Sequence, residues 1–205
     1  MIGVLDFGGG NLASVGYALD RLEAGWTLVR TPSELDAVEA LIFPGVGAAG
    51  AAMAGLRAAH LVPALQTFLR SGRPYLGICL GLQILFDQSA EDGLSCLGLL
   101  PGRVVRLATF EKLPHVGWNT IEVTRRSALL EGVEGESFYF THSYVAEPVS
   151  LEAACARTTH GVPFVSALSA GPVTGVQFHP ERSGAAGLRL LRNFTDLPAG
   201  GADAD

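Results

Sequence analysis

The chain has 205 residues with 48% hydrophobic and 17% charged residues, a composition that suits one globular domain and excludes a disordered chain. Its formal net charge of −6 excludes the basic surface expected of a nucleic-acid-binding protein. The N-terminus shows no signal-peptide pattern, and no apolar run approaches the ~18 residues needed to span a bilayer, so we expect a cytoplasmic protein without membrane partners.

Strands and helices alternate in the first half of the predicted structure. A one-sided apolar pattern predicts a helix over 12–22. Thr31, Pro32 and Glu34 are typical of a capped helix start. An Ala-rich helical stretch runs to about residue 70, with a new start at Pro63. Strands are predicted at 2–5, 26–29, 40–43 and 75–78. This alternation predicts an α/β fold with a parallel, doubly wound sheet.

The pattern changes after about residue 102, where short apolar runs are separated by turn residues. We expect some of these strands to be antiparallel and to extend the sheet, and a final helix over 183–193. The strands are predicted at 103–107, 120–123, 137–140, 151–154, 164–168 and 173–178. No long linker interrupts the chain, so we predict one domain over 1–197 and a disordered tail over 198–205.

Cys79 is the strongest candidate nucleophile. It follows a predicted strand, precedes an apolar helical pattern and is flanked by Gly77 and Gly81, which is typical of a strand-to-helix elbow. Such a turn exposes the central side chain and places a thiol at a helix N-terminus, which favours the thiolate. The alternative is a buried structural cysteine. With Cys96 and Cys155 widely spaced and no Cys-x-x-Cys pair, neither a disulfide framework nor a cysteine zinc site is expected.

His179 is the best candidate for the base that a cysteine nucleophile needs. It ends a predicted strand, Pro180 stops that strand, and Glu181 is two residues on, where it could orient the imidazole. The alternative is a solvated His-Glu pair on the surface. His60 and His160 are expected to be exposed.

A second glycine-rich turn, 44–47, follows the third predicted strand. Here Gly45 and Val46 could turn a backbone N–H toward a tetrahedral intermediate, together with the N–H of Leu80 after the nucleophile. The alternative is an ordinary strand-to-helix turn.

The stretch 8–13 matches the dinucleotide pattern Gly-x-Gly-x-x-Ala after a strand. The acid expected about 20 residues later is missing, and Arg30 stands at the end of the second predicted strand. An arginine could suit a 2′-phosphate, so NADP binding is a minor alternative.

With Cys79, His179 and Glu181 in place, the chain resembles a class I glutamine amidotransferase domain over residues 1 to 195. The family's two most specific blocks are Gly-Ile-Cys-Leu-Gly-Leu-Gln at 77–83 and Gly-Val-Gln-Phe-His-Pro-Glu at 175–181. Further blocks at 6–12, 44–47, 114–119 and 142–144 are similar to the glutaminase subunits of imidazole glycerol phosphate synthases. The resemblance implies a three-layer, flavodoxin-like class I glutaminase fold.

The resemblance also implies a reaction, in which glutamine is hydrolysed through a γ-glutamyl thioester on the cysteine and ammonia is released. Some residues then match positions that hold glutamine: Gln83, Glu91 and the segment His142, Ser143 and Tyr144. Without the resemblance, Gln83 is a polar helix residue and Glu91 a solvated loop acid. No cofactor and no metal are implied.

The implied partner is a (β/α)₈-barrel cyclase subunit, which forms a heterodimer with the glutaminase and uses its ammonia in histidine biosynthesis. Candidate docking residues are Asn11, Trp118 and Asn119, the last two in a stretch expected to be a loop. Departures from the family pattern at Ala49, Ala90 and Val145 lie outside the three catalytic candidates. Two alternatives remain: the glutaminase subunit of anthranilate or aminodeoxychorismate synthase, and a non-catalytic regulatory subunit.

Overall fold

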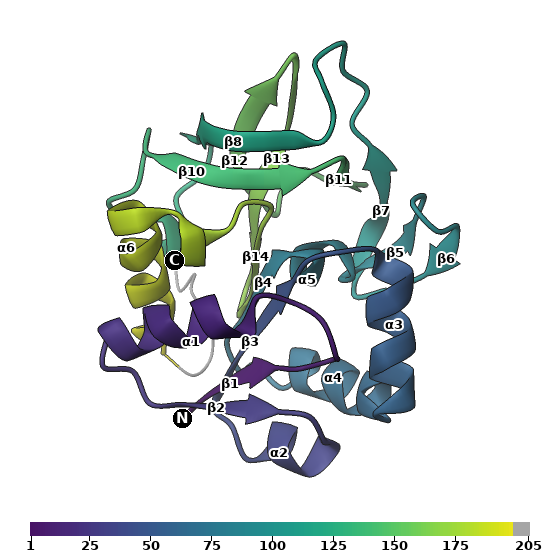
Figure 1. Ribbon diagram of the computed structural model, residues 1–205, viewed down its shortest axis with the longest axis vertical. Coiled ribbons are helices and arrows are strands. Elements are labelled where there is room, and N and C mark those ends of the chain that lie inside the picture. Colours follow the sequence, from purple (N-terminus) through teal and green to yellow (C-terminus); the bar gives the residue numbers. More distant parts are fainter. Residues whose placement is uncertain (199–205) are drawn as a thin grey trace.

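The structure, a computed structural model, describes residues 1–198 and is built around one eight-stranded sheet (Figure 1). The strand order is β2-β1-β3-β4-β14-β13-β12-β9. The first four pairs in this order are parallel and the last three antiparallel. The strands are β1 (Ile2–Leu5), β2 (Trp26–Val29), β3 (Ala40–Gly45), β4 (Tyr75–Cys79), β9 (Glu122–Val123), β12 (Ala154–His160), β13 (Val162–Ala170) and β14 (Val173–Val176).

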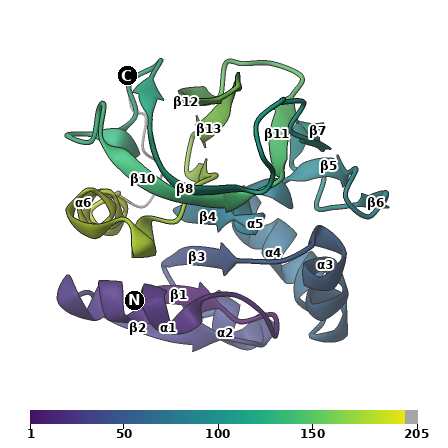
Figure 2. The same ribbon diagram turned by 45° about the horizontal axis from the view of Figure 1, so that its top comes forward.

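Helices cover both faces of the parallel part, because its strands are apolar on both sides (Figures 1 and 2). In β3, Ile42 packs into the cluster that contains α1 and α6, while Leu41 and Phe43 pack against the opposite layer. The helices are α1 (Leu12–Arg21) and α6 (Gly184–Thr195) on the first face, and α2 (Pro32–Asp36), α3 (Ala49–Ala58) and α4 (Leu61–Arg70) on the second. The predicted three-layer, doubly wound α/β fold with an antiparallel extension is confirmed.

Two smaller sheets lie beside the main one. A ribbon of β8 (His115–Thr120) and β10 (Ser137–His142) crosses the molecule above β4, as Figure 2 shows. The N–H of His179 donates to the carbonyl of Tyr139 in β10, which attaches this ribbon at the end of β14. The other sheet has the order β11-β7-β5-β6. Its strands are β5 (Phe86–Ser89), β6 (Leu94–Ser95), β7 (Leu100–Arg106) and β11 (Tyr144–Pro148).

Most predicted elements are present, including the capping box in which Thr31 and Glu34 each bond the other's backbone. The break in the Ala-rich helix lies at His60, which has a left-handed backbone, rather than at Pro63. Residues 115–120 form a strand, so the predicted loop at Trp118 is wrong. The predicted strand 151–154 is also misplaced, because β12 begins only at Ala154.

The predicted tail over 198–205 lies, apart from Pro198, outside the described residues. Within residues 1–198, none of the helices combines the length and the hydrophobicity that a bilayer crossing requires.

Candidate active site

Cys79 lies where β4 passes directly into the one-turn helix α5 (Leu80–Gln83). Its backbone has φ 51° and ψ −99°, a conformation that residues other than glycine rarely adopt. A Cβ on Gly77 would lie 2.4 Å from the carbonyl oxygen of Gly81, and a Cβ on Gly81 would lie 2.1 Å from that of Phe43. Both flanking positions therefore require glycine. The backbone geometry is that of the elbow that the sequence predicts, but the side chain of Cys79 is buried, with 6% of its surface exposed, so the predicted exposure of the thiol is wrong.

His179 and Glu181 lie next to each other shortly after β14. His179 precedes the 3₁₀ turn η2 (Pro180–Arg182), and Glu181 lies within it. The Nδ1 atom of His179 is 2.8 Å from Oε1 of Glu181, and both side chains are 1% exposed. Burial by itself lowers the pKa of His179, but interactions with Cys79 and Glu181 outweigh it and raise the pKa to about 10. The Nε2 atom has no hydrogen-bond partner of good geometry among residues 1–198. The Cys79 side chain is nevertheless close enough to the imidazole to contribute to its raised pKa.

The turn at 44–47 borders the elbow. Gly45 pairs with Cys79 in the register of β3 and β4, and a Cβ on Gly45 would lie 2.7 Å from the Cβ of Leu80. The two predicted oxyanion segments thus lie against each other at the elbow. Val46 is 44% exposed. On the other side of this turn, a Cβ on Gly10 would lie 3.0 Å from the carbonyl oxygen of Pro44, so the loop that contains Asn11 touches it.

Gln83 is buried one turn after the nucleophile. Its amide nitrogen donates to the carbonyl oxygen of Tyr144 at 2.9 Å and to Oε1 of Gln177 at 3.1 Å. The amide of Gln177 in turn donates to the sulfur of Cys79 at 3.4 Å. Gln83 and Tyr144, two residues predicted to contact substrate, are thereby connected to the sulfur.

His142 is almost completely buried and does not line an open surface. Its Nδ1 donates to the carbonyl of Tyr144 at 3.0 Å, and its Nε2 is 3.2 Å from Nδ1 of His115. Burial, with the neighbouring His115, lowers the pKa of His142 to about 3. Ser143 is half-buried, and its carbonyl accepts from the N–H of Leu107.

Glu91 lies at the N-terminus of α3. Its carboxylate accepts from the N–H of Ala49, while the neighbouring Asp92 accepts from the N–H of Gly50 at 2.8 Å. Burial and the charge of Asp92 raise the pKa of Glu91. These contacts place Glu91 beside the first turn of α3, the helix that follows the 44–47 turn in the chain.

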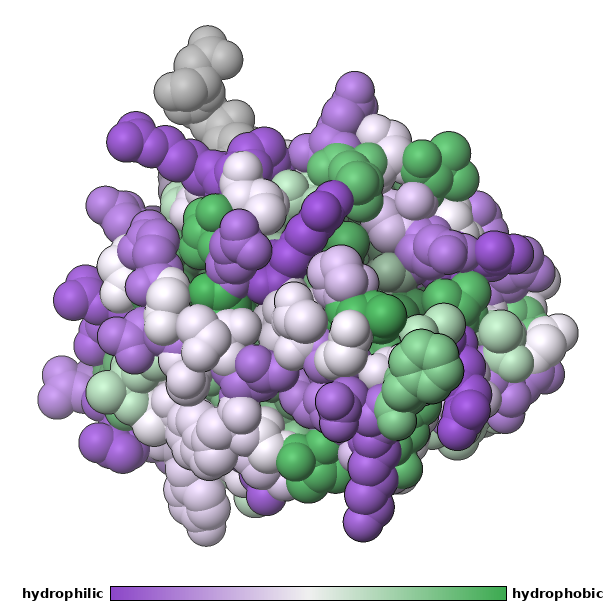
Figure 3. All heavy atoms as spheres, turned by 90° about the horizontal axis from the view of Figure 1, so that it is seen from above, coloured by the Kyte–Doolittle hydropathy of each residue, from purple (hydrophilic) through white to green (hydrophobic). Residues whose placement is uncertain are grey.

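The three predicted docking residues differ in exposure. Trp118 is 59% exposed, whereas Asn11 and Asn119 are half-buried. The amide of Asn119 donates to the carbonyl of Thr159 at 2.9 Å and lies 3.2 Å from Nε2 of His115. Figure 3 looks onto the end of the molecule where β8, β12 and β13 lie in Figure 1. Apolar and hydrophilic side chains alternate there without one continuous apolar area, as on transient protein interfaces.

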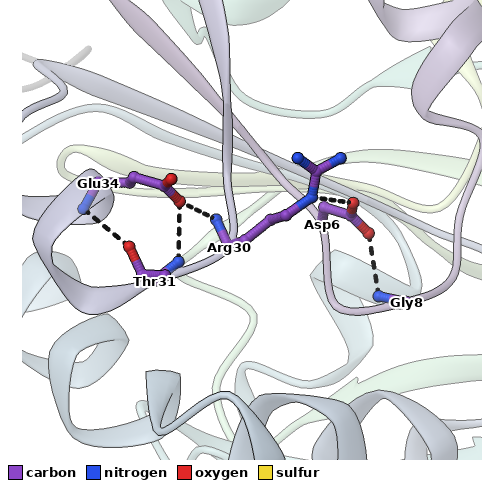
Figure 4. Close-up of polar contacts among 5 residues, drawn as sticks. All are labelled: Asp6, Gly8, Arg30, Thr31 and Glu34. Atoms are coloured by element: carbon purple, nitrogen blue, oxygen red, sulfur yellow. Dashed lines mark hydrogen bonds and ion pairs between the residues drawn. The ribbon is translucent and has the colours of Figure 1, made fainter.

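Polar contacts stabilise the glycine-rich loop after β1 (Figure 4). One carboxylate oxygen of Asp6 accepts from the N–H of Gly8 at 3.0 Å, and the other from Nε of Arg30 at 2.8 Å. Arg30 is therefore paired within the protein, which argues against the NADP alternative. Glu34 accepts from the N–H groups of Arg30 and Thr31 and so holds the start of α2 beside this contact.

Two residues of this region are absent from the sequence-based candidates. Gln177, just past the end of β14, contacts the sulfur, and its position two residues before His179 next to the predicted strand 173–178 could have indicated it. His115 stacks on the ring of His160 at 4.1 Å, and the partly buried His160 ends β12 rather than lying in an exposed turn. Pairing between β8 and β10 brings His115 opposite His142, which the sequence alone does not show.

The chain is similar to known glutamine amidotransferases over nearly its whole length. The model of the family described as "Glutamine amidotransferase class-I" matches residues 3–197. The imidazole glycerol phosphate synthase subunit HisH of Methanothermobacter thermautotrophicus is 46% identical over 198 residues, which cover 96% of this chain and 98% of that protein. The subunit of the same name from Halobacterium salinarum is 45% identical over 204 residues, covering 96% and 93%.

Solved structures agree on the fold. A crystal structure of a glutamine amidotransferase superposes with a TM-score of 0.75 at 25% identity and covers 94% of this chain and 96% of its own. PurLQS from Thermotoga maritima gives a TM-score of 0.75 at 20% identity with the same coverage, a likeness of fold alone. The chain therefore belongs to the class I glutamine amidotransferases and, within them, to the family of the HisH subunits of imidazole glycerol phosphate synthase.

Proposed function

We propose that this chain is the glutaminase subunit of an imidazole glycerol phosphate synthase, with Cys79 as nucleophile, His179 as acid and base, and Glu181 as the group that orients His179. The observation that carries this proposal is the elbow at Cys79, with the buried His179–Glu181 pair behind it. A protonated imidazole beside the thiol stabilises the thiolate, which is the attacking form.

The proposed reaction has two steps. The thiolate of Cys79 attacks the γ-carbonyl carbon of glutamine, and His179 gives its proton to the departing ammonia, leaving a γ-glutamyl thioester. His179 then removes a proton from water, whose oxygen attacks the thioester, and the thiolate departs as glutamate forms. Proton transfer of this kind typically contributes ~10² to 10⁴ in rate.

Backbone N–H groups would stabilise the negative oxygen in both steps. Leu80 offers its N–H at the start of α5, and the turn with Gly45 and Val46 is the second proposed donor. Removal of one such donor typically costs ~10² to 10³ in rate. Gln83 and Glu91 are proposed to hold the substrate, Glu91 through a charge-assisted contact with its α-ammonium group.

Ammonia must then reach a second protein before water protonates it. We propose a heterodimer with a (β/α)₈-barrel cyclase subunit in the cytoplasm, which uses the ammonia, together with its nucleotide ligand, to make imidazole glycerol phosphate and an aminoimidazole carboxamide ribotide (AICAR) during histidine biosynthesis. The residues proposed for docking are Asn11, Trp118 and Asn119. We also propose that 1–197 form one domain, because strands from both halves of the chain share the main sheet.

The test is ammonia release from glutamine by the full-length chain, alone and with the cyclase and its nucleotide ligand. We expect low activity alone, a large increase with the cyclase, and loss of activity in Cys79→Ala. Release that persists in Cys79→Ala would exclude the proposed nucleophile. Activation by the synthase of anthranilate or aminodeoxychorismate instead of the cyclase would replace the assigned partner.

A further inference from the structure

A line of hydrogen bonds through the protein interior ends on the sulfur of Cys79. It passes from Gln177 to Gln83 and to the carbonyl oxygen of Tyr144, over distances of 3.4, 3.1 and 2.9 Å. We propose that Gln177 is a hydrogen-bond donor to the reacting sulfur and that a buried histidine pair, His142 and His115, holds this donor in place.

The direction of each bond follows from one atom, the carbonyl oxygen of Tyr144, which can only accept. Gln83 must therefore present its amide nitrogen to this oxygen. The second hydrogen of that nitrogen points to Gln177, which must accept through Oε1. The nitrogen of Gln177 is then left facing the sulfur. Turning the Gln83 amide would set its oxygen against the carbonyl oxygen of Tyr144, two acceptors, and turning the Gln177 amide would set its nitrogen against that of Gln83, two donors.

The same carbonyl sets the direction of the bonds on its other side. His142 must donate to Tyr144 from Nδ1, so the Nε2 of its neutral ring accepts from Nδ1 of His115. The Nε2 of His115 then accepts from the amide of Asn119, whose second hydrogen goes to the carbonyl of Thr159. The low pKa values of the two rings, about 3 and about 4, agree with this neutral arrangement.

The arrangement has two consequences at the reacting centre. An N–H directed at sulfur stabilises the thiolate more than the thiol, because hydrogen bonds to charged groups are the stronger ones. Both amide hydrogens of Gln83 are also in use, so this residue can offer only its carbonyl oxygen to a substrate. A substrate group that meets Gln83 must therefore be a donor, such as an ammonium or a carboxamide N–H.

The titratable groups around the sulfur are His179, with Glu181 behind it, and His142, whose charge would be felt by His179. The substitution of Gln177 removes none of these three groups. This inference rests on the proposed role of Cys79 as nucleophile, but its test needs no glutamine. Failure of the inference can therefore be distinguished from failure of the proposed function, which is tested by ammonia release in Cys79→Ala.

The test is the pH profile of alkylation of Cys79 by iodoacetamide in the full-length chain, with modified peptides identified by mass spectrometry to separate Cys79 from Cys96 and Cys155. In Gln177→Met, which keeps the length of the side chain but cannot donate, we expect the midpoint to rise by about one pH unit. A midpoint equal to that of the unchanged protein in folded Gln177→Met would overturn the proposal.

A second pair of variants tests whether His142 and His115 hold Gln177 in place. The same pair tests the proposal if Gln177→Met does not fold. His142→Asn can place an amide N–H where Nδ1 of the ring lies, whereas His142→Leu removes the donor to Tyr144. We expect a profile close to the unchanged protein in His142→Asn and a raised midpoint in His142→Leu. Equal profiles in these two variants would show that the line does not reach the sulfur.

Discussion

The side chains of His179 and Glu181 meet because the chain makes a tight turn between them, shortly beyond the end of β14. Nδ1 and Oε1 are 2.8 Å apart, and the 3₁₀ turn η2 starts at Pro180. The hydroxyl of Ser183 donates to the carbonyl of His179 at 2.6 Å and stabilises this turn. The sequence suggested that the two residues share one face of a strand. In the structure the 3₁₀ turn, and not strand alternation, brings them into contact.

The first prediction concerns Glu181. In Glu181→Gln the acceptor of the Nδ1–H bond loses its charge, so the pKa of His179 should fall and the imidazolium should be less populated at neutral pH. We expect kcat for glutamine hydrolysis in the cyclase complex to fall at least ~10²-fold. KM should change much less. Steady-state kinetics on the complex measure both, and an unchanged kcat would remove Glu181 from the mechanism.

The second prediction is a loss of stability in acid. His115 and His142 have pKa values of about 4 and about 3 in the folded protein, below the ordinary 6.5. The unfolded chain therefore binds protons first as the pH falls, so the stability contributed by the neutral rings is complete above pH 6.5. Between 6.5 and about 4 the free energy of unfolding should drop by about 2 kcal/mol or more.

Urea unfolding at several pH values measures this dependence. The double variant His115→Gln/His142→Asn carries no titrating ring at these positions and serves as the control. Its free energy of unfolding should be lower at neutral pH but should change less between pH 6.5 and 4. A slope as steep as that of the unchanged protein would assign the acid sensitivity to other groups.

The third prediction concerns the glycines of the elbow. In Gly77→Ala the new methyl group would lie 2.4 Å from a backbone oxygen that cannot move away easily. We expect a loss of about 3 kcal/mol or more in the free energy of unfolding. Gly25→Ala is the matched control, because its methyl group would meet only Met1, at 3.6 Å. It should cost less than ~0.5 kcal/mol, and equal losses in the two variants would contradict the steric argument.

The fourth prediction tests docking through Trp118. Because this side chain is 59% exposed in the isolated subunit, Trp118→Ala should leave the thermal midpoint of that subunit nearly unchanged. If the ring is buried against the cyclase, its removal should weaken binding by about 30-fold, equivalent to about 2 kcal/mol. Isothermal titration calorimetry provides the Kd. Val149→Ala, at a side chain that is 80% exposed, is the control and should bind normally.

The fifth prediction concerns the anchor of the loop that contains Asn11. Asp6→Ala removes the acceptor for both Gly8 and Arg30, so the loop should become less ordered. We expect cyclase binding to weaken by about threefold to tenfold while alkylation of Cys79 is unchanged. The control Glu147→Ala breaks an exposed ion pair with Arg103, on β7 and β11. If both variants bind the cyclase equally well, the Asp6 anchor has no part in docking.

Much of the fold could be predicted because its signals are local. Thr31 and Glu34 indicate a helix start within four residues, and fully buried strands such as 75–78 read as continuous apolar runs. The strand at 115–120 could not be recognised in this way. Only one of its faces packs against the protein, Val116 and Trp118 are exposed, and Gly117 has a φ of 135°. Its pattern therefore resembles that of a loop.

The sequence by itself determined the elbow at Cys79, since the Gly-x-Cys-x-Gly pattern is local and the clash that forbids a side chain at 77 is with Gly81, within one turn of chain; the clash at 81 is with Phe43 on the neighbouring strand β3. Only the tertiary structure decided what touches the sulfur. Gln177 is 98 positions from Cys79 in the chain, and Gln83 is 61 positions from Tyr144. The donor and acceptor roles along this line of hydrogen bonds depend on the carbonyl oxygen of Tyr144, a buried atom that can only accept. No local pattern contains that information, because strand pairing alone brings these groups together.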